Sequence, residues 1–206
     1  MRKAIVRYNF LPDDFYQKLK NEVLGIELTG LHGGRSSLDL PEQDIKTPML
    51  KAFNDVYTNN IAFWRGQCLR LGLDIDLSFH ASYIEPRNGL IQTDEEFFYG
   101  RMDLGFGFNG YGEINGGKGN HIDNFNRVIS GLLYFSDQKD FEGGEFEFTD
   151  KAGNTDQSIN IAQNMAIFSV QDKDGWHRVN PLREIKEYPR IAIYFALSYS
   201  QKYWNR

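Results

Sequence analysis

Two features that decide the fold meet in the stretch HIDNFNRVISGLLYF, residues 121–135. It begins with His121 and Asp123, two positions apart. Because residues i and i+2 of a β-strand point to the same face, their imidazole and carboxylate can lie side by side. The part from Arg127 to Phe135 is an apolar run typical of a strand. The stretch therefore predicts a strand next to a pair of side chains suited to binding a metal.

A second imidazole follows 56 residues later, at His177. Two histidines and one carboxylate can occupy one face of a metal and leave the opposite face open, which is the arrangement of non-haem Fe(II) oxygenases. Arg190, just before the apolar run IAIYF, strengthens this interpretation. Such enzymes need a buried cation to hold the carboxylate of an oxo-acid cosubstrate, and an inward-facing cation in an apolar strand needs an anionic partner.

The pattern on both sides of this stretch predicts many short strands, separated by turn residues such as Gly153-Asn154 and Asp174-Gly175. We expect strands at residues 75–84, 127–135, 145–148, 159–161, 165–170, 177–180 and 190–198. Gly143-Gly144 is interpreted as a hairpin turn without chemistry. Short strands after N-terminal helices predict an α+β, mainly β fold: a double-stranded β-helix, or jelly roll, with N-terminal supporting helices.

The N-terminal part predicts a strand at 5–10, a helix at 15–23, a loop at 29–43 and one long amphipathic helix at 47–71. Residues 85–120, rich in glycine, are expected to form long loops beside the metal site, with a possible strand only near 102–108. We expect a single domain over residues 1–206, in which 1–72 supply the first strand and supporting helices and 73–206 the jelly-roll core.

Composition narrows the functional classes. The 206 residues carry a formal net charge of −5, which argues against a nucleic-acid partner bound through a basic surface. The sequence lacks an apolar run long enough to span a bilayer, so no membrane partner is expected. The only cysteine is Cys68, and the charged N-terminus does not resemble a signal peptide. These features predict a cytoplasmic protein in a reducing compartment; its oligomeric state is left open.

Five motifs appear in the order seen in 2-oxoglutarate/Fe(II)-dependent dioxygenases. They are His121-Ile122-Asp123, Arg127 to Phe135, Phe141-Glu142-Gly143-Gly144-Glu145-Phe146, Trp176-His177-Arg178-Val179 and Arg190-Ile191-Ala192. Over residues 111–198 the chain resembles the prolyl-4-hydroxylase-like branch of that family. One departure is the thirteen-residue step from His177 to Arg190, which predicts an outward-bulging hairpin between Pro181 and Pro189.

The resemblance implies that His121, Asp123 and His177 bind iron. It implies that Arg190 and the hydroxyl of Tyr134 bind the C5 carboxylate of 2-oxoglutarate, and that Tyr111 lies near this cosubstrate. Fe(II), 2-oxoglutarate and O2 are the implied cofactors and cosubstrates, with ascorbate as a further candidate.

The sequence leaves alternatives open for single residues. Tyr134 could be a core residue, and Arg190 could belong to a surface ion pair. Arg127, Trp176 and Arg178 could face a substrate or serve packing. The remaining histidines, His32 and His80, are expected to be structural.

The function predicted from these residues is hydroxylation of a C–H bond in a peptidyl residue, an amino acid or a small metabolite, with release of succinate and CO2. Asp123 favours hydroxylation over halogenation, because a halogenase leaves the carboxylate's position on iron open for a halide. Two alternatives remain: a jelly-roll metal enzyme that does not use 2-oxoglutarate, and a non-catalytic binding module of the same fold.

Overall fold

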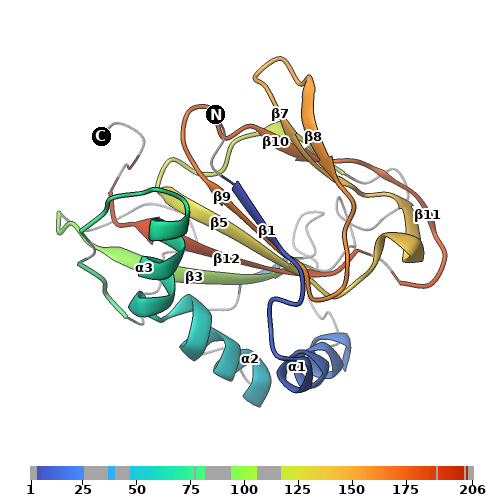
Figure 1. The fold of residues 1–206 in the computed structure, drawn as a ribbon, viewed down its shortest axis with the longest axis horizontal. Helices are drawn as coiled ribbons and strands as arrows, with labels where there is room; N and C mark the ends of the chain where they lie inside the picture. The colour runs from blue at the N-terminus through green and yellow to red at the C-terminus, as the bar shows by residue number, and fades with distance from the viewer. Residues whose placement is uncertain are drawn as a thin grey trace.

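The computed structural model describes residues 4–25, 37–39, 47–76, 78–81, 94–105, 117–188, 190–201 and 203. Its strands form three antiparallel sheets (Figure 1). The largest sheet has the order β1 (Ala4–Arg7), β9 (Ala166–Val170), β5 (Arg127–Tyr134), β12 (Ala192–Tyr199), β3 (Phe98–Gly105) and β2 (Ser37–Asp39). A smaller sheet has the order β4 (Lys118–His121), β10 (His177–Val179), β7 (Phe146–Thr149) and β8 (Thr155–Ile159). Strands β11 (Leu182–Ile185) and β6 (Phe141–Gly143) form a separate pair.

Residues of one face of the largest sheet pack against the other two sheets. Alternate residues of β5 and β12 point to this inner face, because side chains alternate along a strand. The inner core combines residues of all three sheets: Tyr134, Ile167, Ala192, Phe146, Phe148, Val179, Phe141 and Leu182. Sheets that face each other across an apolar core are expected of the predicted jelly roll.

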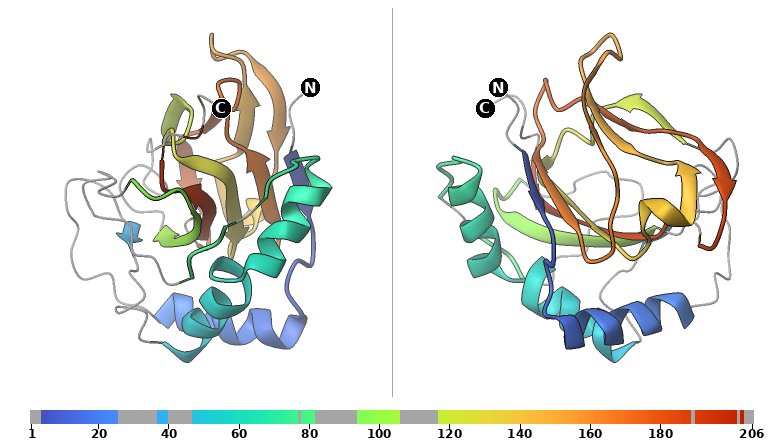
Figure 2. Two further views of the ribbon diagram at one scale, coloured as in Figure 1. Left: turned by 90° about the vertical axis from the view of Figure 1, so that its left-hand side faces the viewer. Right: turned by 45° about the vertical axis from the view of Figure 1, so that its right-hand side comes forward.

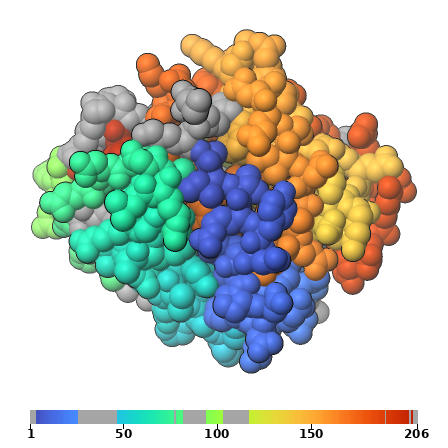
Figure 3. Space-filling model, viewed as in Figure 1, coloured from blue at the N-terminus to red at the C-terminus, as the bar shows by residue number. Residues whose placement is uncertain are grey.

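The opposite face of the largest sheet carries the helices (Figure 2). These are α1 (Asp13–Gly25), α2 (Pro48–Phe53), the π-helical turn η2 (Asn54–Thr58) and α3 (Ile61–Arg70). Together with β1 they form one continuous surface in the space-filling view (Figure 3). The outer core joins helix and strand residues, among them Leu19, Leu50, Phe53, Trp64, Ile129, Phe168, Ile193, Phe195 and Leu197. The predicted supporting helices are therefore confirmed.

The prediction of one long helix over 47–71 is wrong. The chain leaves the helix after η2, and Asn60 has an extended backbone, with its side-chain oxygen accepting hydrogen bonds from Ala62 N and Phe63 N at 2.9 and 3.3 Å. Asn60 therefore caps a new helix, α3. Val56, an apolar residue within the segment predicted as one amphipathic helix, lies in η2 and is 47% exposed.

Three further predictions on the strands need correction. In the described part of 75–84, the only pairing is an isolated parallel bridge between Phe79 and Phe98, so these described residues are not a strand of any sheet. Conversely, the region 85–120, expected to be mostly loop, contains all of β3 and most of β4. The strand expected at 159–161 lies earlier in the chain, as β8 (Thr155–Ile159), because its first four residues are polar and exposed and carry no apolar pattern.

The corner at Gly143-Gly144 is not a hairpin turn. Strand β6 before it pairs with β11, whereas β7 after it pairs with β10 and β8. Both glycines have positive φ, 79° and 71°, and a Cβ on Gly143 would lie 2.1 Å from Pro181 O. The same pairing corrects the expected bulging hairpin at 181–189, because residues Leu182–Ile185 pair with β6 rather than with their own neighbours.

A short 3-10 helix, η3 (Gln138–Asp140), precedes β6. Among the described helices, none combines the length and apolar character that crossing a membrane requires.

Candidate metal and cosubstrate site

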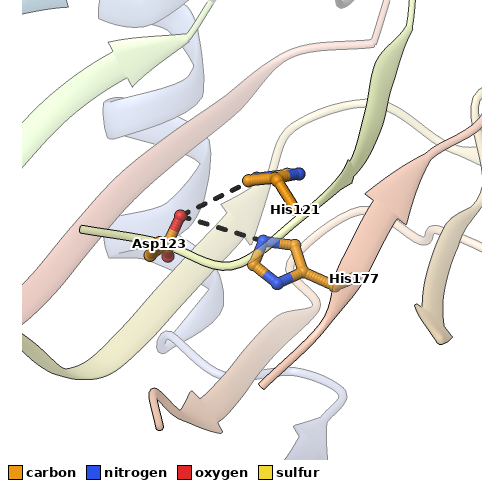
Figure 4. A group of neighbouring side chains, drawn as sticks. All are labelled: His121, Asp123 and His177. Carbon is orange, nitrogen blue, oxygen red and sulfur yellow. Dashed lines mark ion pairs between the residues drawn. The ribbon is translucent and has the colours of Figure 1, made fainter. Parts of the chain in front are cut away.

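The side chains of His121, Asp123 and His177 converge between the smaller sheet and the inner face of the largest sheet. His121 ends β4, His177 begins β10, and the two residues are register partners across the β4–β10 pair. Asp123 follows β4 by two residues. Its Oδ1 lies 3.8 Å from Nε2 of each histidine (Figure 4). All three donor atoms are within 4.8 Å of one another.

Backbone carbonyls decide which nitrogen of each imidazole faces this centre. Nδ1 of His121 lies 2.7 Å from Gly119 O, and Nδ1 of His177 lies 2.9 Å from Gly175 O. A carbonyl oxygen only accepts hydrogen bonds, so each Nδ1 carries the proton and donates. In the neutral imidazole, Nε2 then presents its lone pair. Both histidines are therefore held in the tautomer that a metal requires.

Burial keeps the imidazole of His121 neutral. The pKa of His121 is lowered to about 4, first by burial and then by the neighbouring His177 and Lys118. Burial alone would raise the pKa of the Asp123 carboxyl. Charge interaction with His177 and Lys118 and a hydrogen bond from Ser130 outweigh burial and hold that pKa below its usual range. Near neutral pH the site therefore offers a neutral Nε2 on His121 and an anionic carboxylate on Asp123.

The second oxygen of Asp123 is held from the largest sheet. Oδ2 accepts a hydrogen bond from Ser130 Oγ at 2.5 Å and one from the Tyr194 hydroxyl at 3.4 Å. Sequence reasoning missed both residues. The available signals were a serine that interrupts the apolar strand β5 and a tyrosine four residues after Arg190, which a strand places on the same face.

Arg190 and Tyr134 also lie together. Nη2 of Arg190 donates to the Tyr134 hydroxyl at 3.1 Å, and its Cζ lies 5.2 Å from the centre of the Tyr134 ring. The two residues are 3% and 0% exposed, so Arg190 does not belong to a surface ion pair. Tyr134 is both a core residue and a partner of this buried cation.

The remaining candidates have other surroundings. Tyr111 lies outside the described residues. Arg127 is buried and donates to Asn126 Oδ1 and Ser198 Oγ. Arg178 forms a 2.6 Å ion pair with Glu147. His80 contacts the ring of Phe97, with ring centroids 5.1 Å apart. Neither Arg178 nor His80 is among the converging donors.

The donor set fits Fe(II). Nε2 of His121 is buried and has no hydrogen-bond partner, which is costly for a polar atom unless a ligand binds it. Two imidazole nitrogens and a carboxylate oxygen are the 2-His-1-carboxylate set of non-haem iron sites, and the carboxylate supplies charge compensation. The side chains are 20%, 10% and 8% exposed for His121, Asp123 and His177, so the site is reachable yet mostly shielded from water.

Comparison with known proteins agrees with this chemistry. Residues 106–197 match the family model of the 2OG-Fe(II) oxygenase superfamily. No curated protein sequence matches the chain significantly.

Solved structures of similar fold include three prolyl hydroxylases. The prolyl-4-hydroxylase of Pseudomonas putida is 14% identical, with a TM-score of 0.55 and coverage of 96% of this chain and 93% of that one. A prolyl 4-hydroxylase of Phytophthora capsici is 17% identical, with a TM-score of 0.61 and coverage of 98% and 60%. A Trichoplax adhaerens prolyl hydroxylase, in complex with a hypoxia inducible factor peptide fragment, is 14% identical, with a TM-score of 0.55 and coverage of 95% and 83%.

These structural likenesses confirm the predicted double-stranded β-helix, and the family match confirms the predicted enzyme class. That class uses Fe(II), 2-oxoglutarate and O2, so the alternative of a non-catalytic binding module is not retained. Residues 106–197 thus match the 2OG-Fe(II) oxygenase superfamily, the match indicates a dioxygenase, and the chain has a prolyl-hydroxylase-like fold.

Proposed function

We propose that His121, Asp123 and His177 bind Fe(II), and that Arg190 and Tyr134 bind the C5 carboxylate of 2-oxoglutarate. The observation that carries this proposal is the convergence of the three donor atoms within 4.8 Å, with both imidazoles held in the metal-binding tautomer. Tyr111, which lies outside the described residues, is kept as a further candidate contact to 2-oxoglutarate.

The relative position of the metal-binding donors and the Arg190–Tyr134 pair supports their use in one site. Ser130, which contacts Asp123, and Tyr134, which contacts Arg190, lie four residues apart on β5, and Tyr194 and Arg190 are four residues apart along the chain. Ser130 and Tyr134 lie on β5 and Tyr194 lies on the neighbouring strand β12, whereas Arg190 lies two residues before β12 begins. Four strand residues span roughly 13 Å between Cα atoms. Since the Arg190 side chain is long, a five-carbon dicarboxylate fits between the buried cation and the donor cluster.

Each residue has a definite task in this proposal. Arg190 neutralises and orients the C5 carboxylate, for which its planar guanidinium is suited, and the Tyr134 hydroxyl adds a further hydrogen-bond contact. His121 and His177 donate electron pairs from Nε2, and Asp123 from Oδ1. Bound iron supplies the redox chemistry that couples oxidation of 2-oxoglutarate to succinate and CO2 with hydroxylation of a C–H bond. The apolar inner core excludes water from the reacting groups.

We propose a peptidyl residue as the substrate, with proline as the first candidate. The support is the fold shared with several prolyl hydroxylases, one of which is in complex with a peptide fragment. A free amino acid or a small metabolite remains the alternative predicted from the sequence.

A substrate screen tests this proposal. The purified enzyme with Fe(II), 2-oxoglutarate and O2 is incubated with a proline-containing peptide library, and the products are analysed by mass spectrometry. The proposal predicts peptides that gain one oxygen atom, with one succinate formed per hydroxylation. If free amino acids are hydroxylated and no peptide is, the peptide assignment is wrong. Turnover that does not depend on 2-oxoglutarate would contradict the cosubstrate assignment.

A further inference from the structure

We propose that Ser130 and Tyr194 are positioning residues that hold Oδ2 of Asp123, so that Asp123 offers only Oδ1 to the metal. This inference rests on the proposed function, because it takes Asp123 as a ligand. It assigns a role to two residues outside the predicted ligand and cosubstrate sets.

The two carboxylate oxygens of Asp123 have different surroundings. Oδ1 faces Nε2 of both histidines, at 3.8 Å each. Oδ2 faces the hydroxyls of Ser130 and Tyr194, at 2.5 and 3.4 Å. One oxygen therefore points to the metal-binding donors and the other to the largest sheet.

A count of protons shows why two hydroxyls are suited to this position. An ionised carboxylate only accepts hydrogen bonds, and each hydroxyl has one proton to donate. Ser130 donates to Oδ2. The Tyr194 hydroxyl lies 3.1 Å from Ser130 Oγ as well as 3.4 Å from Oδ2, so its proton supports the same oxygen directly or through the serine.

The Tyr194 hydroxyl lies next to the Asp123 carboxylate, and burial, followed by the negative charge of Asp123, raises the pKa of its phenol above the usual range.

The hydroxyls of Ser130 and Tyr194 come from two neighbouring strands, β5 and β12, which pair along most of their length. Leu132, two residues after Ser130 on β5, pairs with Tyr194 on β12, so both side chains rise from one rigid inner face. Asp123, in contrast, lies beyond the end of β4 and has no strand partner of its own. Anchoring to the sheet compensates for that freedom. Without it, the carboxylate could rotate and offer either oxygen, or both, to a metal.

The test compares metal binding by Ser130→Ala, Tyr194→Phe and the double variant with that of the unmodified protein. Mn(II) alone is titrated by electron paramagnetic resonance, without 2-oxoglutarate or substrate. Loss of a hydrogen bond behind a metal ligand typically weakens metal affinity about 10- to 100-fold. We expect a loss in this range for Ser130→Ala, a smaller one for Tyr194→Phe, and the largest for the double variant. Ser130→Thr keeps the hydroxyl and should retain most of the affinity.

Ser169→Ala is the matched control. Ser169 is the register partner of Ser130 on β9 and is as buried, 6% against 7% exposed. Its hydroxyl, however, accepts a hydrogen bond from Gln171 Nε2 rather than contacting Asp123. Ser169→Ala should bind Mn(II) like the unmodified protein.

The visible absorption bands of bound Co(II) provide a spectroscopic readout of the ligands. They should change in Ser130→Ala and Tyr194→Phe and stay unchanged in Ser169→Ala. Folding of each variant is checked by thermal unfolding without metal.

Failure of the inference and failure of the proposed function are distinguishable. If the unmodified protein binds Mn(II) and Asp123→Ala abolishes binding, but the folded double variant keeps full affinity and the same Co(II) spectrum, the positioning role is wrong. An affinity loss in Ser169→Ala equal to that in Ser130→Ala would also overturn it. If Asp123→Ala binds Mn(II) unchanged, the ligand assignment itself fails.

Discussion

At the residue scale, the site depends on two backbone carbonyls. Gly119 O and Gly175 O each lie two residues before a histidine and accept its Nδ1–H, which turns both Nε2 lone pairs toward Asp123. Strand geometry thus prepares the donor set before any metal binds. A preorganised set loses less conformational entropy on binding than a flexible one.

His177→Ala should abolish stoichiometric Fe(II) binding while the protein stays folded. One of three ligands is lost, and the imidazole contributes mainly to the site rather than to the outer core. Iron content after anaerobic loading is the measurement. His80→Ala is the control, since His80 is exposed and its ring contacts Phe97. Full iron content in His177→Ala would show that the ligand assignment is wrong.

Arg190→Ala should raise the KM for 2-oxoglutarate far more than Tyr134→Phe does. Removing the cation from a buried charge pair costs about 2–5 kcal/mol, whereas a single hydrogen bond contributes roughly 0.5–1.5 kcal/mol and up to about 3 kcal/mol when its acceptor is charged. These values correspond to factors of about 30 to several thousand for the arginine and about 2 to 13, rising to about 160, for the tyrosine. Kinetics at varied 2-oxoglutarate measure both. The reverse order would mean that Tyr134 binds the acid and Arg190 only supports the strand.

The sequence predicts the residues that would touch metal and cosubstrate, because the i, i+2 spacing of His121 and Asp123 and the run after Arg190 carry a pattern. It did not predict Ser130 and Tyr194. Their role depends on which strands become neighbours: β5 and β12 are far apart in the chain, and their pairing is a property of the folded sheet. A serine or tyrosine in a strand also has an ordinary packing interpretation.

At the scale of elements, the helical layer shows the limit of periodicity. The spacing of Leu50, Phe53, Trp64 and Cys68 is apolar at helical steps, and all four are buried. Yet the chain between them contains a π-helical turn and a capped restart at Asn60. Periodicity identifies the buried face, but a cap inside a long pattern is decided by local hydrogen bonds that compete with the helix.

Asn60→Ala should lower the free energy of unfolding by about 1 kcal/mol, in the range of roughly 0.5–2 for the loss of an N-cap. For a chain of this size, this corresponds to a fall in Tm of about 2–4 °C. Asn60→Asp keeps a side-chain acceptor and adds a negative charge favourable at a helix N-terminus, so its Tm should stay near that of the unmodified protein. Thermal unfolding followed by circular dichroism compares the three. Equal Tm values for the Ala and Asp variants would contradict the cap.

The strands show the same limit. Apolar runs such as 127–135 and 165–170 were predicted almost to the residue, whereas β6 and β11 were missed. These two strands are short, and half of β11 is polar and exposed. Their pairing follows from the corner at Gly143-Gly144 rather than from hydrophobic alternation.

At the scale of the whole molecule, the largest sheet carries both cores. Its outer face packs on the helices, and its inner face packs on the smaller sheets and holds the site. The outer core joins residues from α1, α2 and α3 to β5, β9 and β12, so the N-terminal elements and the strands stabilise one another. The single domain over residues 1–206 stays a prediction.

Thermal unfolding should therefore follow one cooperative transition. The loss of helical signal in far-ultraviolet circular dichroism should coincide with the change in fluorescence of Trp64, which is buried between α3 and the sheet. Trp176→Phe and Trp204→Phe remove the other two tryptophans, so that the fluorescence reports on Trp64 alone. Two separate midpoints would show that the helical layer and the jelly roll unfold independently.

The central claim is that Fe(II) and 2-oxoglutarate share one site formed by residues of the inner face. The most direct measurement is succinate formation from 2-oxoglutarate in air, with and without Fe(II), for the unmodified protein, His177→Ala and Arg190→Ala. The account predicts succinate only when the unmodified protein is supplied with Fe(II), none with His177→Ala, and recovery with Arg190→Ala only at much higher 2-oxoglutarate. Succinate formation that is independent of added iron in metal-free protein, or undiminished in either variant, would contradict it.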